Sequence, residues 1–309
     1  MCNLCTNYIQ LFDGFISICC PAWNSLGMVP LEGKTFKEVW NSPKIQKAIS
    51  SNEMCFTSCP YYNKVGTVTG KPGITRVMVS FDETCNLKCQ TCRTKILKSD
   101  PEVLQKRFKE LEEDFKDLED IEISGSGDPI ASPVTRRWLQ SLTREKFPKL
   151  KTITIQTNGL LFTEKFYRSL PEFVRERLKK VIVSIDAVNK ETYEKIRIGG
   201  DWGKLQKNLK FLSTLNLGRV FCFVVQRDNY LQIEEFCKMA ESYHARAYYE
   251  QVAWWQSRVS KEEFDRQNIF ADSNPEVRRE LRRQLKAVQR KSMLQLDIPE
   301  SLDKPKFLI

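Results

Sequence analysis

Three cysteines, Cys85, Cys89 and Cys92, lie at the spacing CxxxCxxC in the segment that runs from Phe81 to Arg93. A 4Fe-4S cube is held by four thiolates, so three cysteines on one loop leave one iron open to a substrate or cofactor. The alternative is a zinc knuckle whose fourth ligand is remote in the sequence. Both interpretations predict metal chemistry at this loop.

A second set of cysteines precedes this loop: Cys2, Cys5, Cys19, Cys20, Cys55 and Cys59. Disulfides are rare in a reducing compartment, so clustered cysteines there indicate metal or redox chemistry. The sequence contains one histidine, His244, which excludes a two-histidine metal site and a Rieske centre. We therefore expect thiolates to be the metal ligands.

The chain has 309 residues, enough for one large domain or a domain with an appendage. No apolar run approaches the roughly 18 residues of a membrane span. The N-terminus, Met1-Cys2-Asn3, has no secretory leader, so we expect a cytoplasmic protein without a membrane partner. The net charge of +10 is spread along the chain, and nucleic acid is not an expected partner.

From Ile74 onward, short segments rich in Val, Ile and aromatic residues alternate with charged amphipathic stretches. The predicted strands are Arg76–Phe81, Ile121–Ser124, Thr152–Gln156, Val181–Ile185, Val220–Val225 and Ala247–Trp254. The predicted helical stretches are Pro101–Asp117, Thr135–Lys146, Thr163–Leu178, Lys190–Leu215 and Gln232–Tyr243. This alternation predicts an α/β fold with a parallel sheet, and six strands predict a partial (β/α)6 TIM-like barrel.

The chain divides into four stretches. Residues 1–60 form a small cysteine-rich module, 61–73 a Gly- and Pro-punctuated linker, 74–258 the barrel and 259–309 a basic helical extension. In the extension, a helix from Pro275 carries Val277, Leu281, Leu285 and Val288 on one face and basic residues on the others. It is either a packed helix with a solvated basic face or a docking surface for an acidic partner, such as an electron-transfer protein or a phosphorylated substrate.

The cysteine loop after the first predicted strand resembles that of the radical S-adenosylmethionine (SAM) enzymes, over about residues 74–256. The resemblance implies that SAM chelates the open iron through its amino and carboxylate groups. One electron from the cube then cleaves SAM and leaves a 5′-deoxyadenosyl radical. Thr91, before the third cysteine, stands where the family usually has an aromatic residue.

Further motifs fall where that family places its SAM contacts. Ser126-Gly127-Asp128, after the second strand, resembles the GGE motif, with Asp128 as acceptor for the SAM ammonium. Thr157 and Asn158 follow the third strand, and Ser184 and Asp186 follow the fourth, two residues apart and so on one face. Arg197 is similar to an arginine that pairs with the SAM carboxylate.

Residues 1–60 resemble the SPASM or twitch module, which holds an auxiliary cluster. The likeness rests on the series Cys2, Gly14 and Cys19, on the run from Phe36 to Ser42, and on the closing pair Cys55 and Cys59. Usually this module follows the barrel in sequence. The resemblance implies a second 4Fe-4S cluster held by Cys2 or Cys5 with Cys19, Cys55 and Cys59, and structural zinc on the same thiolates is the alternative.

The resemblance leaves the reaction open among epimerisation, oxidation and crosslinking of a peptide or sugar-type substrate. It implies a flavodoxin- or ferredoxin-type electron donor. Cys222, in the fifth strand, is either a buried core residue or a thiol that returns a hydrogen atom to a substrate radical. A non-enzymatic iron–sulfur or zinc-binding protein on the same fold is the alternative function.

Overall fold

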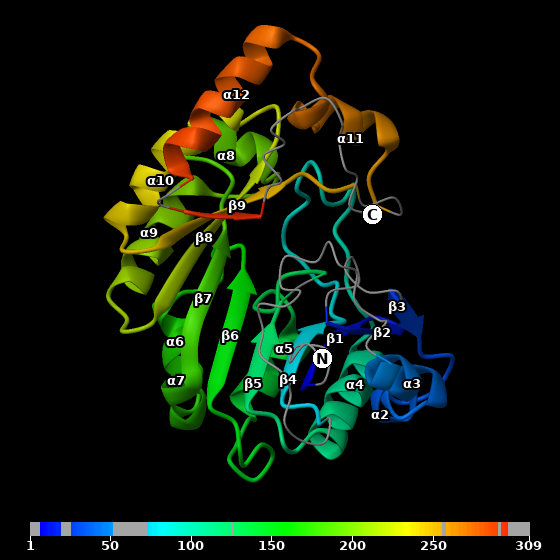
Figure 1. Ribbon diagram of the computed structural model, residues 1–309. Coiled ribbons are helices and arrows are strands. Elements are labelled where there is room, and N and C mark those ends of the chain that lie inside the picture. Colours follow the sequence, from blue (N-terminus) through cyan, green and yellow to red (C-terminus); the bar gives the residue numbers. More distant parts are fainter. Residues whose placement is uncertain are drawn as a thin grey trace. The chain divides into compact units, whose positions relative to one another are not determined.

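The computed structural model describes residues 7–19, 26–51, 73–124, 126–254, 258–289 and 292–295. They belong to two compact units, coloured along the chain in Figure 1. The first unit contains the described parts of 1–84 together with 97–156 and 168–179, and the second contains 85–96, 157–167 and the residues from 180 onward. The three-cysteine loop therefore belongs to the second unit.

All six predicted strands are present, and the α/β fold class is confirmed. They are β4 (Arg76–Ser80), β5 (Asp120–Ile123), β6 (Thr152–Thr157), β7 (Leu178–Ser184), β8 (Gly218–Val225) and β9 (Arg246–Gln251). In the first unit β4, β5 and β6 pair in parallel, and in the second unit β7, β8 and β9 do so. Neither strand set closes on itself.

Three further strands lie in the N-terminal part of the chain, where no strand was predicted. They are β1 (Tyr8–Phe12), β2 (Phe15–Ile18) and β3 (Met28–Pro30). β1 and β2 form an antiparallel hairpin through Asp13-Gly14, where Gly14 has φ +73°, a conformation that suits glycine in tight hairpin turns. β1 also pairs in parallel with β4, so this hairpin extends the sheet of the first unit.

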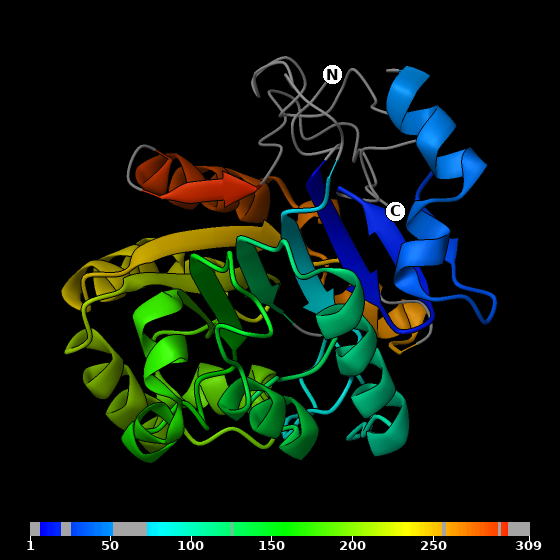
Figure 2. The same ribbon diagram turned by 90° about the horizontal axis from the view of Figure 1, so that it is seen from below.

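The first unit packs its helices through a chain of aromatic rings. Its helices are α2 (Phe36–Trp40), α3 (Pro43–Ser51), α4 (Pro101–Asp114), α5 (Pro133–Gln140) and α7 (Glu172–Arg177), and Figure 2 shows α2 and α3 beside β1 to β3. Phe36 stacks on Phe81, Phe81 meets Phe108 edge-on at 4.9 Å between ring centroids, and Phe108 stacks on Trp138 at 4.3 Å. These contacts link α2, α4 and α5 to the end of β4.

In the second unit, the strands bury one face against α10 (Ile233–Ser242). Phe223 and Tyr249, on neighbouring strands, both contact the ring of Phe236, and the Tyr249 hydroxyl donates to the Ile233 carbonyl at 2.7 Å. Side chains alternate across a strand, so Cys222 and Tyr248 lie on the opposite face. That face is free of α10 and is the more polar one.

Two of the predicted helical stretches are each interrupted. Thr163–Leu178 contains α6 (Glu164–Ser169) and α7, separated by Pro171, which has no N–H for a continuing helix. Lys190–Leu215 contains α8 (Lys190–Ile196) and α9 (Trp202–Ser213), separated by Gly199 at φ +92°. The second interruption matters for the site, since it ends α8 at the residue before Arg197.

The C-terminal part continues with α11 (Lys261–Gln267), α12 (Pro275–Val288) and β10 (Met293–Gln295), which pairs in parallel with β9. Short 3-10 turns occur at Tyr230–Gln232 and Ile269–Ala271. Every helix within the described residues is too short or too polar to serve as a transmembrane span.

Candidate active site

Each sulfur of the three-cysteine loop accepts a hydrogen bond. The donors are the Leu87 backbone N–H to Cys85 Sγ at 3.4 Å, the Arg93 guanidinium to Cys92 Sγ at 3.5 Å, and Arg197 Nη1 to Cys89 Sγ at 3.7 Å. Donors and positive charge beside a sulfur stabilise the thiolate, the form that binds iron. The residues present therefore fit an iron–sulfur cluster on this loop.

The three thiols do not meet at a single point. Within the described residues, no three His, Cys, Asp or Glu side chains converge on one metal-ion position. A cube needs no such convergence, because each cysteine ligates a different iron. Burial raises the pKa of the Cys89 thiol to about 11, against the opposing effect of Arg197, so binding iron must displace its proton.

The loop is held in place by the end of α8. The Lys88 N–H donates to the Ile198 carbonyl and the Gln90 N–H to the Ile196 carbonyl, both at 3.0 Å. Carbonyls at a helix C-terminus have no partner within the helix. Because the chain turns at Gly199, these two are available to the cysteine loop.

Arg197, at the same helix end, is buried in an ion pair with Asp186. Arg197 Nη2 lies 2.6 Å from Asp186 Oδ2, and Asp186 Oδ1 accepts the Val224 N–H at 2.8 Å. Burial disfavours the charged guanidinium, but Asp186 and Cys89 outweigh it and raise the pKa of Arg197. The side chain is thus a fixed cation between the Asp186 carboxylate and the Cys89 sulfur.

Asp186 lies beyond the end of β7 at φ +66°, a left-handed conformation that Asp tolerates better than most residues. Its own carbonyl accepts from Asn229 Nδ2 at 2.9 Å. Ser184 and Asp186 were expected to lie on one face of a strand, but β7 ends at Ser184, before Asp186. Ser184 stays in the strand and pairs in register with Cys222.

Asn158 connects the turn after β6 to the cysteine loop. Its Nδ2 donates to Asn86 Oδ1 at 2.9 Å, and its Oδ1 accepts the Leu160 N–H at 3.0 Å. Thr157 Oγ1 accepts the Gly159 N–H at 3.1 Å. The described contacts of Thr157 and Asn158 shape the turn and orient Asn86, which lies between two of the cysteines.

In the first unit, Gly127 lies against the backbone that leads into the cysteine loop. A Cβ at this position would come within 2.2 Å of the Thr84 carbonyl oxygen, and the Asp128 N–H donates to that oxygen at 2.7 Å. Asp128 Oδ1 accepts the N–H groups of Ile130 and Ala131. Ser126, beside Gly127, is partly exposed.

Comparison with known proteins identifies the family. A family model described as "Radical SAM superfamily" matches residues 79–240, just over half of the chain. The chain belongs to the radical SAM superfamily. The match covers the three-cysteine loop, Asn158, Asp186 and Arg197, so the paired residues described above lie within the matched radical SAM domain.

Two curated relatives are similar over part of their length. The "GTP 3′,8-cyclase" of Alkaliphilus oremlandii is 30% identical over 174 residues, which are 54% of this chain and 52% of the relative. The "Probable GTP 3′,8-cyclase" of Methanococcus maripaludis is 29% identical over 140 residues, 43% of each protein. The chain thus spans about half the length of the curated relatives it matches, or less.

The radical SAM fold is also seen in a solved structure. The crystal structure of Streptococcus suis SuiB aligns with a TM-score of 0.51 and 15% identity, covering 81% of this chain and 52% of SuiB. At this identity the likeness shows the fold alone.

Several contacts of this candidate site were not found from the sequence. Asn86 lies between Cys85 and Cys89, and Arg93 directly follows Cys92. The position of Arg93 next to a cysteine is a sequence signal that could have identified this contact. Glu250 pairs in register with Val224 on the face opposite α10, and burial raises the pKa of its carboxyl. Its position depends on strand register, which local sequence does not show.

Of the predicted auxiliary ligands, only Cys19 lies among the described residues. It is buried directly after β2, at φ +58°, and its N–H donates to the Tyr8 carbonyl at 3.1 Å. Cys2, Cys5, Cys55 and Cys59 lie outside the described residues, as does the 61–72 part of the predicted linker.

Proposed function

We propose that the chain is a radical SAM enzyme in which Cys85, Cys89 and Cys92 hold a 4Fe-4S cluster and its open iron binds SAM. The observation that carries the proposal is the donor to each sulfur of this loop, above all Arg197 to Cys89. When bound, the cluster and SAM supply a 5′-deoxyadenosyl radical that abstracts a hydrogen atom from the substrate.

The chain's own residues bind and orient these groups. Arg197 is placed to pair with an anionic group beside Cys89, and Asp186 keeps it charged and fixed. Asn158 holds the cysteine loop through Asn86. We assign SAM contacts to Ser126, Gly127, Asp128, Thr157, Asn158, Ser184, Asp186 and Arg197.

The N-terminal region is proposed to be a SPASM- or twitch-type module with a second 4Fe-4S cluster. Its ligands would be Cys2 or Cys5 together with Cys19, Cys55 and Cys59. The β1–β2 hairpin supports this, since it buries Cys19 directly after a strand and joins it to the sheet through Tyr8. Iron analysis separates this module from a structural zinc site.

The substrate is proposed to be polar, of peptide or sugar type. In each unit the strand face opposite the helices carries polar residues in register: Glu122 with Thr154 in the first unit, and Ser184 with Cys222 and Tyr248 in the second. The curated relatives favour a nucleotide as a second candidate. Substrate polarity is common to all three classes.

Cys222 is proposed as the hydrogen-atom donor of an epimerisation. It lies on the polar strand face, next in register to Ser184 and Tyr248. Its thiol would give one hydrogen atom to the substrate radical and become a thiyl radical, which one electron and one proton from the reductant system would restore.

The test is SAM cleavage by anaerobically reconstituted protein with dithionite. The proposal predicts 5′-deoxyadenosine in proportion to cluster content. Protein that holds a full cluster and forms none would be the non-enzymatic iron–sulfur protein. With candidate substrates in deuterated water, gain of one deuteron indicates epimerisation, and loss of two hydrogens indicates oxidation or crosslinking.

A further inference from the structure

Helix α12 has one face fixed in the core of the second unit. Asn274 caps its N-terminus and Pro275 occupies the first turn, while Leu281, Leu285 and Val288 are buried. Gln284 is hydrogen-bonded at both ends of its amide: Nε2 donates to the Leu231 carbonyl and Oε1 accepts the Glu234 N–H. The rotation of α12 about its axis is therefore defined, and so is the face that it leaves outside.

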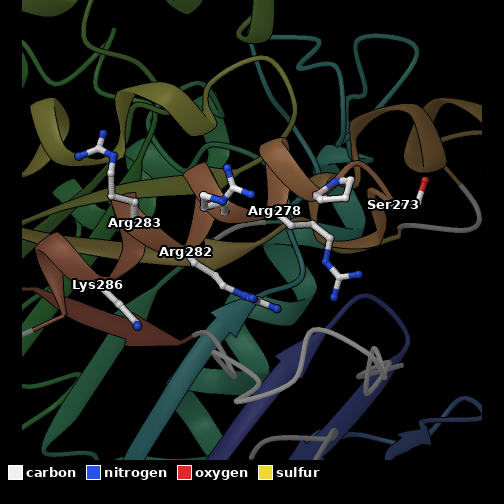
Figure 3. Close-up of a pocket in the computed structure, with 7 residues that line it drawn as sticks. Ser273, Arg278, Arg282, Arg283 and Lys286 are labelled. Atoms are coloured by element: carbon white, nitrogen blue, oxygen red, sulfur yellow. The ribbon is translucent and has the colours of Figure 1, made fainter.

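The outer face of α12 gathers basic side chains around an open hollow. Its lining residues are Ser273, Pro275, Arg278, Arg279, Arg282, Arg283 and Lys286, which we call the basic face, and the hollow has a volume of about 590 Å³. Figure 3 shows Arg278, Arg282 and Lys286 extending from the helix on one side.

The charge of the basic face is only partly balanced. Arg283 pairs with Glu280 at 2.7 Å and with Glu234 at 3.4 Å. Arg279, Arg282 and Lys286 have no carboxylate partner among the residues that the structure describes. Three like charges spaced three to four residues apart on a helix repel one another, which an acidic partner would relieve.

The segment that leads into α12 contacts the cysteine loop. Gln267 Nε2 donates to Asp228 Oδ2 at 2.8 Å, and the side-chain amides of Gln267 and Gln90 lie 3.1 Å apart. Gln90 lies between Cys89 and Cys92. Arg227 donates its backbone N–H to the Gln267 carbonyl and pairs with Asp272 at 2.5 Å. The basic face therefore begins within a few residues of a segment that touches the loop.

We propose that the basic face of α12 is the docking surface for an acidic electron-donor protein of the flavodoxin type. This rests on the proposed function, in which the cluster must receive an electron from outside the chain. One electron leaves the reduced flavin of the donor and enters the cube, so the donor is oxidised by one electron and the cube is reduced by one.

The exposure of these side chains favours a protein partner over a small anion. Arg279, Arg283 and Lys286 are exposed, and Arg278 and Arg282 are partly exposed. Arginine is enriched at protein interfaces, and a patch of one charge steers a partner of the opposite charge toward the surface. The first turn of α12 also carries Glu276, which would repel a phosphate at the helix N-terminus.

The test compares two triple variants of equal charge change. Arg279→Gln/Arg282→Gln/Lys286→Gln neutralises the basic face, and Lys204→Gln/Lys207→Gln/Lys210→Gln neutralises three exposed lysines on α9 of the same unit. Formation of 5′-deoxyadenosine is measured with dithionite and, separately, with flavodoxin reduced by its reductase and NADPH. Flavodoxin binding to the cluster-loaded protein is measured directly by calorimetry.

We expect the α12 variant to keep the dithionite-driven rate of the wild type. Its apparent KM and Kd for flavodoxin should rise about tenfold or more, as loss of electrostatic steering predicts. Added salt should weaken flavodoxin binding to the wild type more than to the variant, and the α9 variant should behave as the wild type.

Wild-type affinity for flavodoxin in the α12 variant overturns the proposal, as does an equal loss in the α9 variant. A fall in the dithionite-driven rate also overturns it, because the basic face would then act on SAM or substrate. If the wild type cleaves no SAM with dithionite, the proposed function fails, whereas the calorimetric comparison still decides the docking surface.

Discussion

Arg197 joins two parts of the site: one of its nitrogens lies 2.6 Å from Asp186 Oδ2, and another lies 3.7 Å from Cys89 Sγ. Asp186 and Cys89 are far apart in sequence, on the segment after β7 and on the cysteine loop. A buried guanidinium between them fixes the distance and angle at which the loop meets the strand end. The first prediction concerns this pair.

Asp186→Asn keeps the oxygen that accepts the Val224 N–H and removes the charge that balances Arg197. A buried charge left without its partner costs about 3–5 kcal/mol. We expect the free energy of unfolding to fall by about that amount, measured by chemical denaturation. The control Lys238→Gln breaks the exposed pair of Lys238 with Glu234 on α10, and should cost about 0.5 kcal/mol or less. Equal losses in the free energy of unfolding would show that the buried pair stabilises the fold no more than the exposed pair does.

Gly127→Ala tests the close approach of Gly127 to the backbone of Glu83 and Thr84. The new Cβ would meet the Thr84 oxygen and the Glu83 carbonyl carbon, both of them backbone atoms that cannot rotate away. We expect a loss of about 1–3 kcal/mol in stability and a lower iron content after reconstitution. Gly73→Ala is the control, because nothing lies within 4 Å of its added Cβ. Normal iron loading in Gly127→Ala would contradict the prediction.

Asn158→Asp tests the hydrogen bond to Asn86. The change is isosteric, but it sets a carboxylate oxygen against Asn86 Oδ1 in place of a donor. The lost bond costs about 1–3 kcal/mol, so a chelator should remove iron from the variant faster than from the wild type. Asn189→Asp is the matched control, since Asn189 caps α8 and Asp caps helices equally well. The bond is unimportant for the cluster if both variants lose iron at the wild-type rate.

Cys222→Ala tests the proposed hydrogen-atom donor. The smaller side chain should cost about 1–2 kcal/mol as a cavity, so the protein should fold. SAM cleavage and hydrogen abstraction should continue, whereas the epimerised product should fall sharply or give way to oxidised by-products. Cys237→Ala removes a buried thiol on α10 and should leave the product unchanged. Full product yield from Cys222→Ala would show that Cys222 is a buried core residue and not the hydrogen-atom donor. The proposal of epimerisation would then lose its support.

The sequence was informative where the physical signal is local. Runs of β-branched and aromatic residues predicted β4 to β9, and cysteine spacing pointed to a loop that lies within the matched radical SAM domain. It was uninformative where the contact is distant: Asn158 and Asn86 are paired across 72 residues, and Glu250 lies beside Val224 through strand register alone. β1 to β3 were missed because they are short and interrupted by turns. Lys190–Leu215 was predicted as one helical stretch although it contains Gly199 and Gly200, and the use of the freed carbonyls by Lys88 and Gln90 depends on the folded chain.

The most direct test of the account is the triple variant Cys85→Ala/Cys89→Ala/Cys92→Ala, measured for iron and for 5′-deoxyadenosine beside the wild type. If each cube binds four irons, the wild type should hold about eight and the variant about four, in the N-terminal module. The variant should form no 5′-deoxyadenosine with dithionite and SAM. Zinc in place of the remaining iron would revise the N-terminal module alone, whereas SAM cleavage by the variant at the wild-type rate would contradict the assignment of the cluster to Cys85, Cys89 and Cys92.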